Sequence, residues 1–491
     1  MTFLQKCTQT IKEYRYPLIF NVVFAFIYVL PLLLTNVYYA DDLRRAVNGV
    51  GWDYDGRYFS SFLMNKITAG GFISDYFPYS IIFSAIILSI GGYIISIILG
   101  LEKDRKYKLS SCILLINPFF LENLSYRWDT IPMSVSIVVL IIPFLFVSSR
   151  TLFVLSSIIG ICITLFTYQA SIVIYPLMAI LILINHCIDD NKKTIESFIL
   201  FICSFILGLI IYKLISLLFP TNFGGRDSII LFKENFLSNL IINSERAWEL
   251  IRTAFSRYFK IVIVLSIFLC VISYIKYLIS SKPIIQKGLI ILLPLFAIIL
   301  IPFIILILEN VWIGPRILVG FSFLIYLMLI IINNLSQRII PIISFLFIFI
   351  SLPLMSAYAS ALKSQNSLEV YVSQKITQTV NMEDRILTFE GYLEFSPETY
   401  VAIDKFPIIK QLIRHNLVDN LSWGPKLFAK ANNYMYFPQY VNNEKYEKIM
   451  ENKNMLPVVD ETYYYILRAD SAIVLVDFNA SKSKVERIVV D

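Results

Sequence analysis

Charged residues are scarce in this chain. Only 16% of its 491 residues are Asp, Glu, Lys or Arg, whereas soluble domains contain about 25%. Hydrophobic residues make up 57%, and the mean hydropathy is +0.70. This balance excludes an ordinary soluble protein and is typical of a membrane protein. No basic stripe with interleaved aromatic residues occurs in a polar segment, so we expect no nucleic-acid partner.

Histidine and cysteine are also rare. The two histidines are His186 and His415, which disfavours a serine–histidine–acid triad. The six cysteines all precede residue 271, and neither they nor the histidines have the spacing of metal ligands. A glycine-rich phosphate loop is missing as well. We therefore expect no cofactor and no metal site, although an acidic pair is able to hold a divalent cation. A sugar donor would then arrive attached to lipid.

Long apolar stretches dominate the first 355 residues. A helix needs about 20 apolar residues to cross a bilayer, and the first stretch is too long for a cleavable signal, so we predict a retained anchor. We predict an all-α polytopic membrane protein with about eleven transmembrane helices. The predicted spans are 17–36, 77–100, 109–121, 131–149, 151–168, 171–186, 195–219, 259–281, 288–308, 317–332 and 338–355.

Lysine and arginine are concentrated in alternate loops, and this pattern predicts the orientation. Lys6, Lys12 and Arg15 precede the first span, and the loop 101–108 carries four more basic residues. We therefore place the N-terminus in the cytoplasm. The acidic first loop, 37–76, then lies on the outer side, and an odd number of spans places the C-terminal region there as well.

The composition changes near residue 356. Residues 1–355 carry 27 basic and 18 acidic side chains, a net charge of +9, whereas residues 356–491 carry 15 and 17, a net charge of −2. We predict a transmembrane domain over 1–355 and a small soluble α/β domain over 356–491. In this second domain the patterns predict strands at 385–390, 462–468 and 472–478 and helical structure over 397–414.

Two adjacent carboxylates, Asp41 and Asp42, follow the first apolar stretch. Charges at the edge of a span are costly and are functional candidates. A carboxylate there is able to act as a general base on a hydroxyl while the lipid end of a substrate stays in the bilayer. Other candidates lie in loops predicted on the same side, where aromatic rings, acids and amides suit sugars and arginine suits phosphate. These substrate-binding candidates are Arg57, Glu122, Arg127, Asp129, Tyr168, Gln169 and Arg316.

Five segments, in this order, resemble the phage- and prophage-type serotype-converting O-antigen glucosyltransferases, the Gtr family of integral membrane glycosyltransferases. The resemblance covers roughly residues 17–330. The segments that carry it are Asp41-Asp42-Leu43-Arg44-Arg45, Gly56-Arg57, the stretch from Asn117 to Asp129, Tyr168-Gln169 and Gly314-Pro315-Arg316.

This resemblance implies a GT-C-like architecture in a bacterial inner membrane, with the outer loops and the C-terminal domain in the periplasm. It implies undecaprenyl-phosphate-linked glucose as the donor, O-antigen of lipopolysaccharide as the acceptor, and a functional link to a donor-lipid synthase and a donor-lipid flippase. The implied reaction is a single inverting displacement with Asp41 as base. Asp42 would orient the acceptor or an arginine, and Arg316, Arg127 or Arg57 would hold the donor phosphate.

Structural and functional alternatives stay open at this point. Asp41 and Asp42 are able to pair with neighbouring arginines. Arg127 and Asp129 are able to form a structural ion pair. Arg316 is able to anchor a helix end. Other enzymes compatible with the sequence are a transferase of lipid-phosphate sugars to lipid A and an O-antigen polymerase. A lipid-linked sugar flippase is disfavoured because the charges gather at one predicted surface and no twofold repeat appears.

Overall fold

The computed structural model describes most of the chain. The residues that it describes are 3–103, 105–189, 194–219, 228–230, 235–309, 313–380, 386–418, 423–435, 457–461, 465–469 and 473–479.

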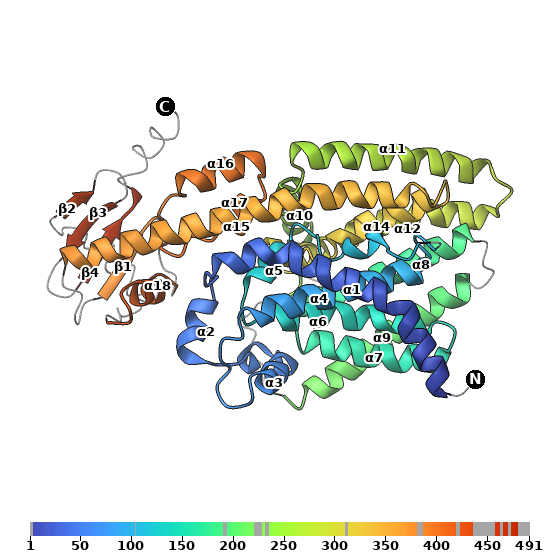
Figure 1. The fold of residues 1–491 in the computed structure, drawn as a ribbon, viewed down its shortest axis with the longest axis horizontal. Coiled ribbons are helices and arrows are strands. Elements are labelled where there is room, and N and C mark those ends of the chain that lie inside the picture. Colours follow the sequence, from blue (N-terminus) through green and yellow to red (C-terminus); the bar gives the residue numbers. More distant parts are fainter. Residues whose placement is uncertain are drawn as a thin grey trace. The chain divides into compact units, whose positions relative to one another are not determined.

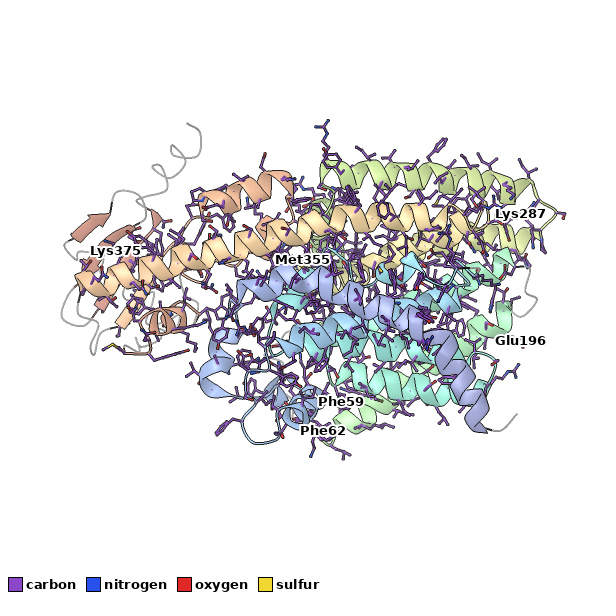
Figure 2. All side chains as sticks on the ribbon, viewed as in Figure 1. Phe59, Phe62, Glu196, Lys287, Met355 and Lys375 are labelled. Atoms are coloured by element: carbon purple, nitrogen blue, oxygen red, sulfur yellow. The ribbon has the colours of Figure 1, made fainter. Side chains whose placement is uncertain are left out.

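The chain divides into two compact units. The first comprises Met1–Leu33 and Val50–Met355, and the second comprises Leu34–Gly49 and Ser356–Asp491. The helix α15 (Ile340–Thr379) runs through the division, which falls at Met355, labelled in Figure 2. Each unit is described by itself below.

The described part of the first unit is built mainly from helices, with one isolated β-bridge between Ile229 and Leu308. Within a bilayer a helix satisfies every backbone polar group inside one segment, which favours helices wherever the apolar stretches occur. Its helices, labelled in part in Figure 1, are α1 (Phe3–Thr35), η1 (Asp53–Asp55), α3 (Tyr58–Ile67), α4 (Tyr79–Ile98), η2 (Leu109–Cys112), α5 (Phe120–Ser125), α6 (Thr130–Ile141), η3 (Ile142–Phe146), α7 (Arg150–Leu165), η4 (Gln169–Val173), α8 (Ile174–Ile188), α9 (Thr194–Ser216), α10 (Phe236–Arg252), α11 (Arg257–Ile279), α12 (Ile284–Leu300), α13 (Phe303–Ile307), η6 (Pro315–Ile317) and α14 (Phe321–Asn333).

Ten helical segments of the described chain are apolar. Six have the length and composition to cross a membrane, namely Arg15–Thr35, Tyr79–Ile98, Gln169–Ile188, Thr194–Ser216, Arg257–Ile279 and Ile340–Thr379. Four are shorter, namely Thr130–Phe146, Arg150–Leu165, Ile284–Leu300 and Phe321–Asn333. These helices make the chain a membrane protein, but the predicted number of eleven spans is not confirmed.

The predicted span at 109–121 is wrong as a continuous helix. The chain forms the short 3-10 helix η2 there, and the next α-helix, α5, begins only at Phe120. Ser110 and Ser111 are buried, and both hydroxyl groups hydrogen-bond within the protein. Asn117 donates from Nδ2 to the carbonyl oxygen of Val319 at 3.1 Å. This segment is apolar because it is buried among other helices. Hydropathy alone does not distinguish such burial inside the protein from contact with lipid.

Close helix packing organises the interior of the first unit. The helices α4, α6 and α7 lie side by side (Figure 1). A Cβ atom on Gly160 of α7 would lie 2.5 Å from the carbonyl oxygen of Val139 in α6, so only glycine permits this approach. Small residues at helix contacts are the usual means of tight packing in membranes. This packing holds the N-terminal end of α6, where Asp129 lies, and the C-terminal end of α7, which Tyr168 and Gln169 follow.

The second unit contains helices and a mixed four-stranded sheet. The strand order is β1 (Ile386–Glu390), β4 (Ile473–Asp477), β3 (Tyr465–Ala469) and β2 (Pro457–Glu461), with β1 parallel to β4 and the other neighbours antiparallel. Ile386 of β1 pairs with Ile473 of β4. Besides the C-terminal part of α15, its elements are α2 (Asp42–Asn48), β1 (Ile386–Glu390), α16 (Pro397–Lys405), α17 (Ile409–Leu412), α18 (Trp423–Ala431), β2 (Pro457–Glu461), β3 (Tyr465–Ala469) and β4 (Ile473–Asp477).

Each of the three predicted strands corresponds to a strand in the structure, whereas α18 and β2 were not predicted. The helix α18 starts with Trp423-Gly424-Pro425, a sequence that local patterns assign to a turn. The strand β2 is short and ends in two acidic residues. The predicted helical region 397–414 is divided into α16 and α17 around Pro407, which cannot donate a backbone hydrogen bond.

Residues 34–49 belong to the second unit, although the predicted domain boundary assigned them to the first. Leu43 is buried in a hydrophobic cluster with Val372 of α15 and with Leu427 and Phe428 of α18. The Tyr39 hydroxyl donates to the carbonyl oxygen of Leu412 at 2.6 Å. Burial of apolar side chains therefore joins this acidic segment to residues more than 300 positions away in the sequence.

Candidate functional site

The nine predicted site residues fall into two groups. Asp41 and Asp42 lie in the second unit, and the seven substrate-binding candidates lie in the first.

The acidic pair occupies a tight turn at the start of α2. Ala40 has a φ of 46°, in the left-handed region that residues other than glycine rarely adopt. The backbone N–H of Asp42 donates to the Tyr39 carbonyl at 3.0 Å, and that of Leu43 donates to the Ala40 carbonyl at 3.1 Å. Strained backbone of this kind often accompanies functional sites.

The two carboxylates of the turn have different surroundings. Asp42 is completely buried, and its Oδ2 accepts the backbone N–H of Tyr39 at 3.1 Å. Asp41 is partly exposed, and its Oδ1 accepts the indole N–H of Trp423 at 3.2 Å. Asp42 therefore stabilises the turn, while Asp41 is the carboxylate of the pair that is accessible to solvent.

Basic side chains of α18 approach the same turn. The ammonium group of Lys430 lies 3.4 Å from the centre of the Tyr38 ring. Lys426, one helical turn earlier, is half-buried and interacts electrostatically with Arg44 and Asp41. The second unit thus places basic side chains beside Asp41.

In the first unit, several candidates converge on Arg316. The Glu122 Oε2 accepts the backbone N–H of Arg316 at 2.8 Å, and the Tyr168 hydroxyl donates to the Arg316 carbonyl at 2.9 Å. The Arg316 guanidinium donates to the Tyr126 hydroxyl at 2.7 Å. Pro315 precedes it in η6, and the fixed φ of proline suits this first helical position. Glu122 and Tyr168 thus hold the main chain that presents the arginine.

Arg57 connects this cluster to Asp129. The Arg57 guanidinium lies 4.0 Å from Asp129 Oδ1 and 5.3 Å from the centre of the Tyr168 ring. The same Asp129 oxygen accepts the indole N–H of Trp52 at 2.6 Å. The structure therefore links Arg57, Asp129, Tyr168, Glu122 and Arg316 through direct contacts.

Two polar atoms of the candidate residues in the first unit have no hydrogen-bond partner among the described residues. They are Arg57 Nε and Gln169 Nε2, and both are buried from solvent. A buried polar group without a partner costs about 1–3 kcal/mol. Such atoms are candidates for contact with oxygen atoms of a bound molecule.

Arg127 differs from the other arginines. It donates to Asp75 Oδ2 at 2.8 Å, and its guanidinium lies 4.2 Å from the centre of the Phe77 ring. The structure thus pairs Arg127 with Asp75 rather than with Asp129, the partner that the loop sequence suggested. Its side chain is only 5% exposed, which makes a structural role the simplest explanation of this residue.

Sequence reasoning did not single out Trp52, Asp75, Tyr126 or Trp423. The signal for Trp52 and Tyr126 was their place in the same polar loops as the candidates. Trp423 gave no local signal, because it meets Asp41 across 382 residues of sequence. Among the described residues, no group of three or more His, Cys, Asp and Glu is arranged to hold a metal ion.

The apolar helices define a membrane protein, and the first unit presents a connected cluster of arginine, carboxylate and aromatic side chains. Comparison with known proteins identifies the class further: the family described as "Glucosyl transferase GtrII" matches residues 30–332. The chain belongs to this glucosyl transferase family, which makes it a glycosyltransferase and confirms the resemblance drawn from the sequence.

The chain is also similar to a protein of Salmonella phage P22, described as "Uncharacterized 55.3 kDa protein in gtrB 5'region". The two are 33% identical over 178 residues, which are 34% of this chain and 35% of the phage protein. The chain thus matches about a third of the length of that relative. No solved structure matches the chain.

Proposed function

We propose that the protein transfers glucose from undecaprenyl-phosphate-glucose to O-antigen on the periplasmic side of the bacterial inner membrane. The observation that carries this proposal is the family match over 30–332, because that range contains Asp41, Asp42 and all seven substrate-binding candidates. The long apolar helices support a lipid-linked donor, since such a donor is itself held in the bilayer.

In the proposed reaction, Asp41 is the general base. An acceptor hydroxyl gives its proton to a carboxylate oxygen of Asp41 while the hydroxyl oxygen forms a bond to the anomeric carbon of glucose. The bond from that carbon to the phosphate oxygen breaks, and undecaprenyl phosphate leaves with the electron pair. This single displacement inverts the anomeric configuration. The partial exposure of Asp41 supports its role, and the complete burial of Asp42 supports a positioning role for that residue.

The cluster of the first unit is proposed to bind the donor. Arg316 and Arg57 supply guanidinium groups for the phosphate, whose oxygens accept paired N–H donors. The buried Arg57 Nε and Gln169 Nε2 support this assignment, because a ligand oxygen would satisfy them. The arginines are held in place mainly by Glu122, Asp129 and Tyr168. The role of Arg127 is its ion pair with Asp75.

The proposed topology places the N-terminus in the cytoplasm, because basic residues precede the first span. It places the second unit in the periplasm, because residues 34–49 of that unit directly follow the first span. Undecaprenyl-phosphate-glucose must be made and brought to the outer leaflet. The proposal therefore includes a functional link to a donor-lipid synthase and a donor-lipid flippase.

The test uses membranes from cells that express the wild type, Asp41→Asn or Asp404→Asn. Asp404 is an exposed acid of α16 and provides the matched control. Each membrane receives radiolabelled undecaprenyl-phosphate-glucose and O-antigen acceptor. We expect transfer by the wild type and the control, and roughly 10²–10⁴-fold less by Asp41→Asn.

Near-normal transfer by Asp41→Asn would remove Asp41 as the base. If the well-expressed wild type transferred no glucose, the proposal itself would fail. Other lipid-phosphate sugars would then be offered to the same membranes, with lipid A as an additional acceptor, before transport of a lipid-linked sugar is assayed.

A further inference from the structure

We propose that Lys426 of α18 and Arg44 of α2 form a phosphate-binding subsite beside Asp41 in the second unit. The ligand would be the phosphate group of a lipid-linked substrate, and this identity rests on the proposed function. The residues of α18 lie beyond the family match, which ends at residue 332.

Apolar packing fixes the two helices against each other. Leu43 of α2 shares a buried cluster with Leu427 and Phe428 of α18. Two polar contacts add to this: the indole N–H of Trp423 donates to Asp41 at 3.2 Å, and Lys430 covers the Tyr38 ring. Lys426 lies between these two contacts in the sequence of α18, which directs it toward the segment that carries Asp41.

Basic side chains outnumber acidic ones where α2 and α18 meet. Asp41, α2 and α18 together carry four basic side chains against two acidic ones, and one of the acids, Asp42, is completely buried. Burial lowers the pKa of Lys426, and the like charge of Arg44 lowers it further, whereas Asp41 acts in the opposite direction. The half-buried ammonium group of Lys426 and the exposed guanidinium group of Arg44 repel each other, and a bound anion would relieve that repulsion.

Phosphate suits this pair of side chains. Lysine offers a compact ammonium charge, and arginine offers a planar fork that donates two parallel hydrogen bonds to phosphate oxygens. A phosphate beside Asp41 would belong to the lipid carrier of the acceptor, as a pyrophosphate, if Arg316 and Arg57 hold the donor as proposed above. It would belong to the donor, as the monophosphate that leaves, if that assignment is replaced. Both ligands share the chemistry, and kinetics separates them.

The binding experiment uses the purified full-length chain in detergent. Its thermal unfolding midpoint is measured against increasing undecaprenyl phosphate, undecaprenyl pyrophosphate or uncharged undecaprenol. The variants are Lys426→Met, Lys426→Arg and Arg44→Met. The matched control is Lys410→Met, which removes an exposed lysine of α17 in the same unit.

We expect the wild type and the control to be stabilised by one of the charged lipids and not by undecaprenol. Lys426→Met and Arg44→Met should need roughly tenfold more of that lipid for half of the effect, and Lys426→Arg should stay near the wild type. Because Arg44 is exposed, its variant serves as the test if Lys426→Met fails to fold. Equal half-saturating concentrations in wild type, Lys426→Met and Arg44→Met would overturn the subsite.

Glucose transfer then identifies the source of the phosphate. A higher KM for the donor alone in Lys426→Met would assign the donor phosphate to the subsite, and a higher KM for the acceptor alone would assign the carrier pyrophosphate. Unchanged KM values for both would overturn the role in catalysis. Lipid binding that depends on Lys426 in a wild type that transfers no glucose would retain the subsite and reject the proposed function.

Discussion

The carboxylates of the two units differ in what they contact. Glu122 and Asp129 in the first unit are buried, and they accept hydrogen bonds from the Arg316 backbone and the Trp52 indole. Asp41 in the second unit is partly exposed, and one of its oxygens accepts the Trp423 indole N–H at 3.2 Å. Sequence patterns treat all of these acids alike. Their contacts separate acids that hold other groups in place from an acid that remains accessible to a substrate.

The adjacent residues Asp41 and Asp42 provide the strongest test of this comparison, because the same substitution can be made in both. Asp41→Asn should lower the transfer rate by roughly 10²–10⁴-fold and leave the unfolding midpoint unchanged, since asparagine cannot accept the proton. Asp42→Asn should keep most of the rate per folded molecule and lose stability on the order of 1 kcal/mol, because a buried acceptor of the Tyr39 N–H is altered.

The measurements are glucose transfer per mole of folded protein and thermal unfolding of the purified chain. Loss of activity in Asp42→Asn and loss of stability in Asp41→Asn would contradict this assignment of the two carboxylates. Asp42 would then be the base, reached through a rearrangement of the turn.

Arg316 offers the next largest effect. Arg316→Lys keeps the charge but loses the planar fork, so it should lower kcat/KM for the donor by roughly tenfold if the phosphate is bound through two parallel hydrogen bonds. Arg150→Lys is the matched control, because Arg150 forms an exposed ion pair with Glu196. The measurement is the dependence of transfer on donor concentration. Equal values for both variants and the wild type would leave Arg316 as an anchor of η6.

Much of this architecture could be predicted from the sequence, and the failures have physical causes. The apolar stretches identified most of the long helices because hydropathy reports directly on transfer from water. The same measure failed at 109–121, where apolar residues are buried inside protein. It also could not assign residues 34–49 to the second unit, since that depends on Leu43 meeting a hydrophobic cluster distant in sequence.

The candidate site shows the same division. Residue chemistry selected Arg57, Glu122, Asp129, Tyr168 and Arg316, and the structure brings these five together. Chemistry alone could not tell that Glu122 binds a backbone N–H, or that Arg127 pairs with Asp75. Those facts depend on tertiary geometry, as does the contact between Trp423 and Asp41, which joins two segments that share no local pattern.

The smallest expected effect concerns Trp423. Trp423→Phe retains an aromatic ring against the hydrophobic cluster but removes the N–H that donates to Asp41. One hydrogen bond contributes about 0.5–1.5 kcal/mol, so kcat should fall roughly two- to tenfold. The KM values should stay unchanged, and the unfolding midpoint should fall by no more than the loss of this one hydrogen bond requires. A residue that only packed the core would instead alter stability and leave kcat per folded molecule intact.

Trp248→Phe is the control for this last comparison, because Trp248 is 61% exposed on α10 and has the same side chain. A fall in kcat confined to Trp423→Phe would mean that the indole holds Asp41 in the orientation in which it accepts the proton. If kcat remained at the wild-type value in both variants, the accessible carboxylate would orient itself without help from α18. The contribution of α18 would then be confined to the proposed phosphate binding by Lys426.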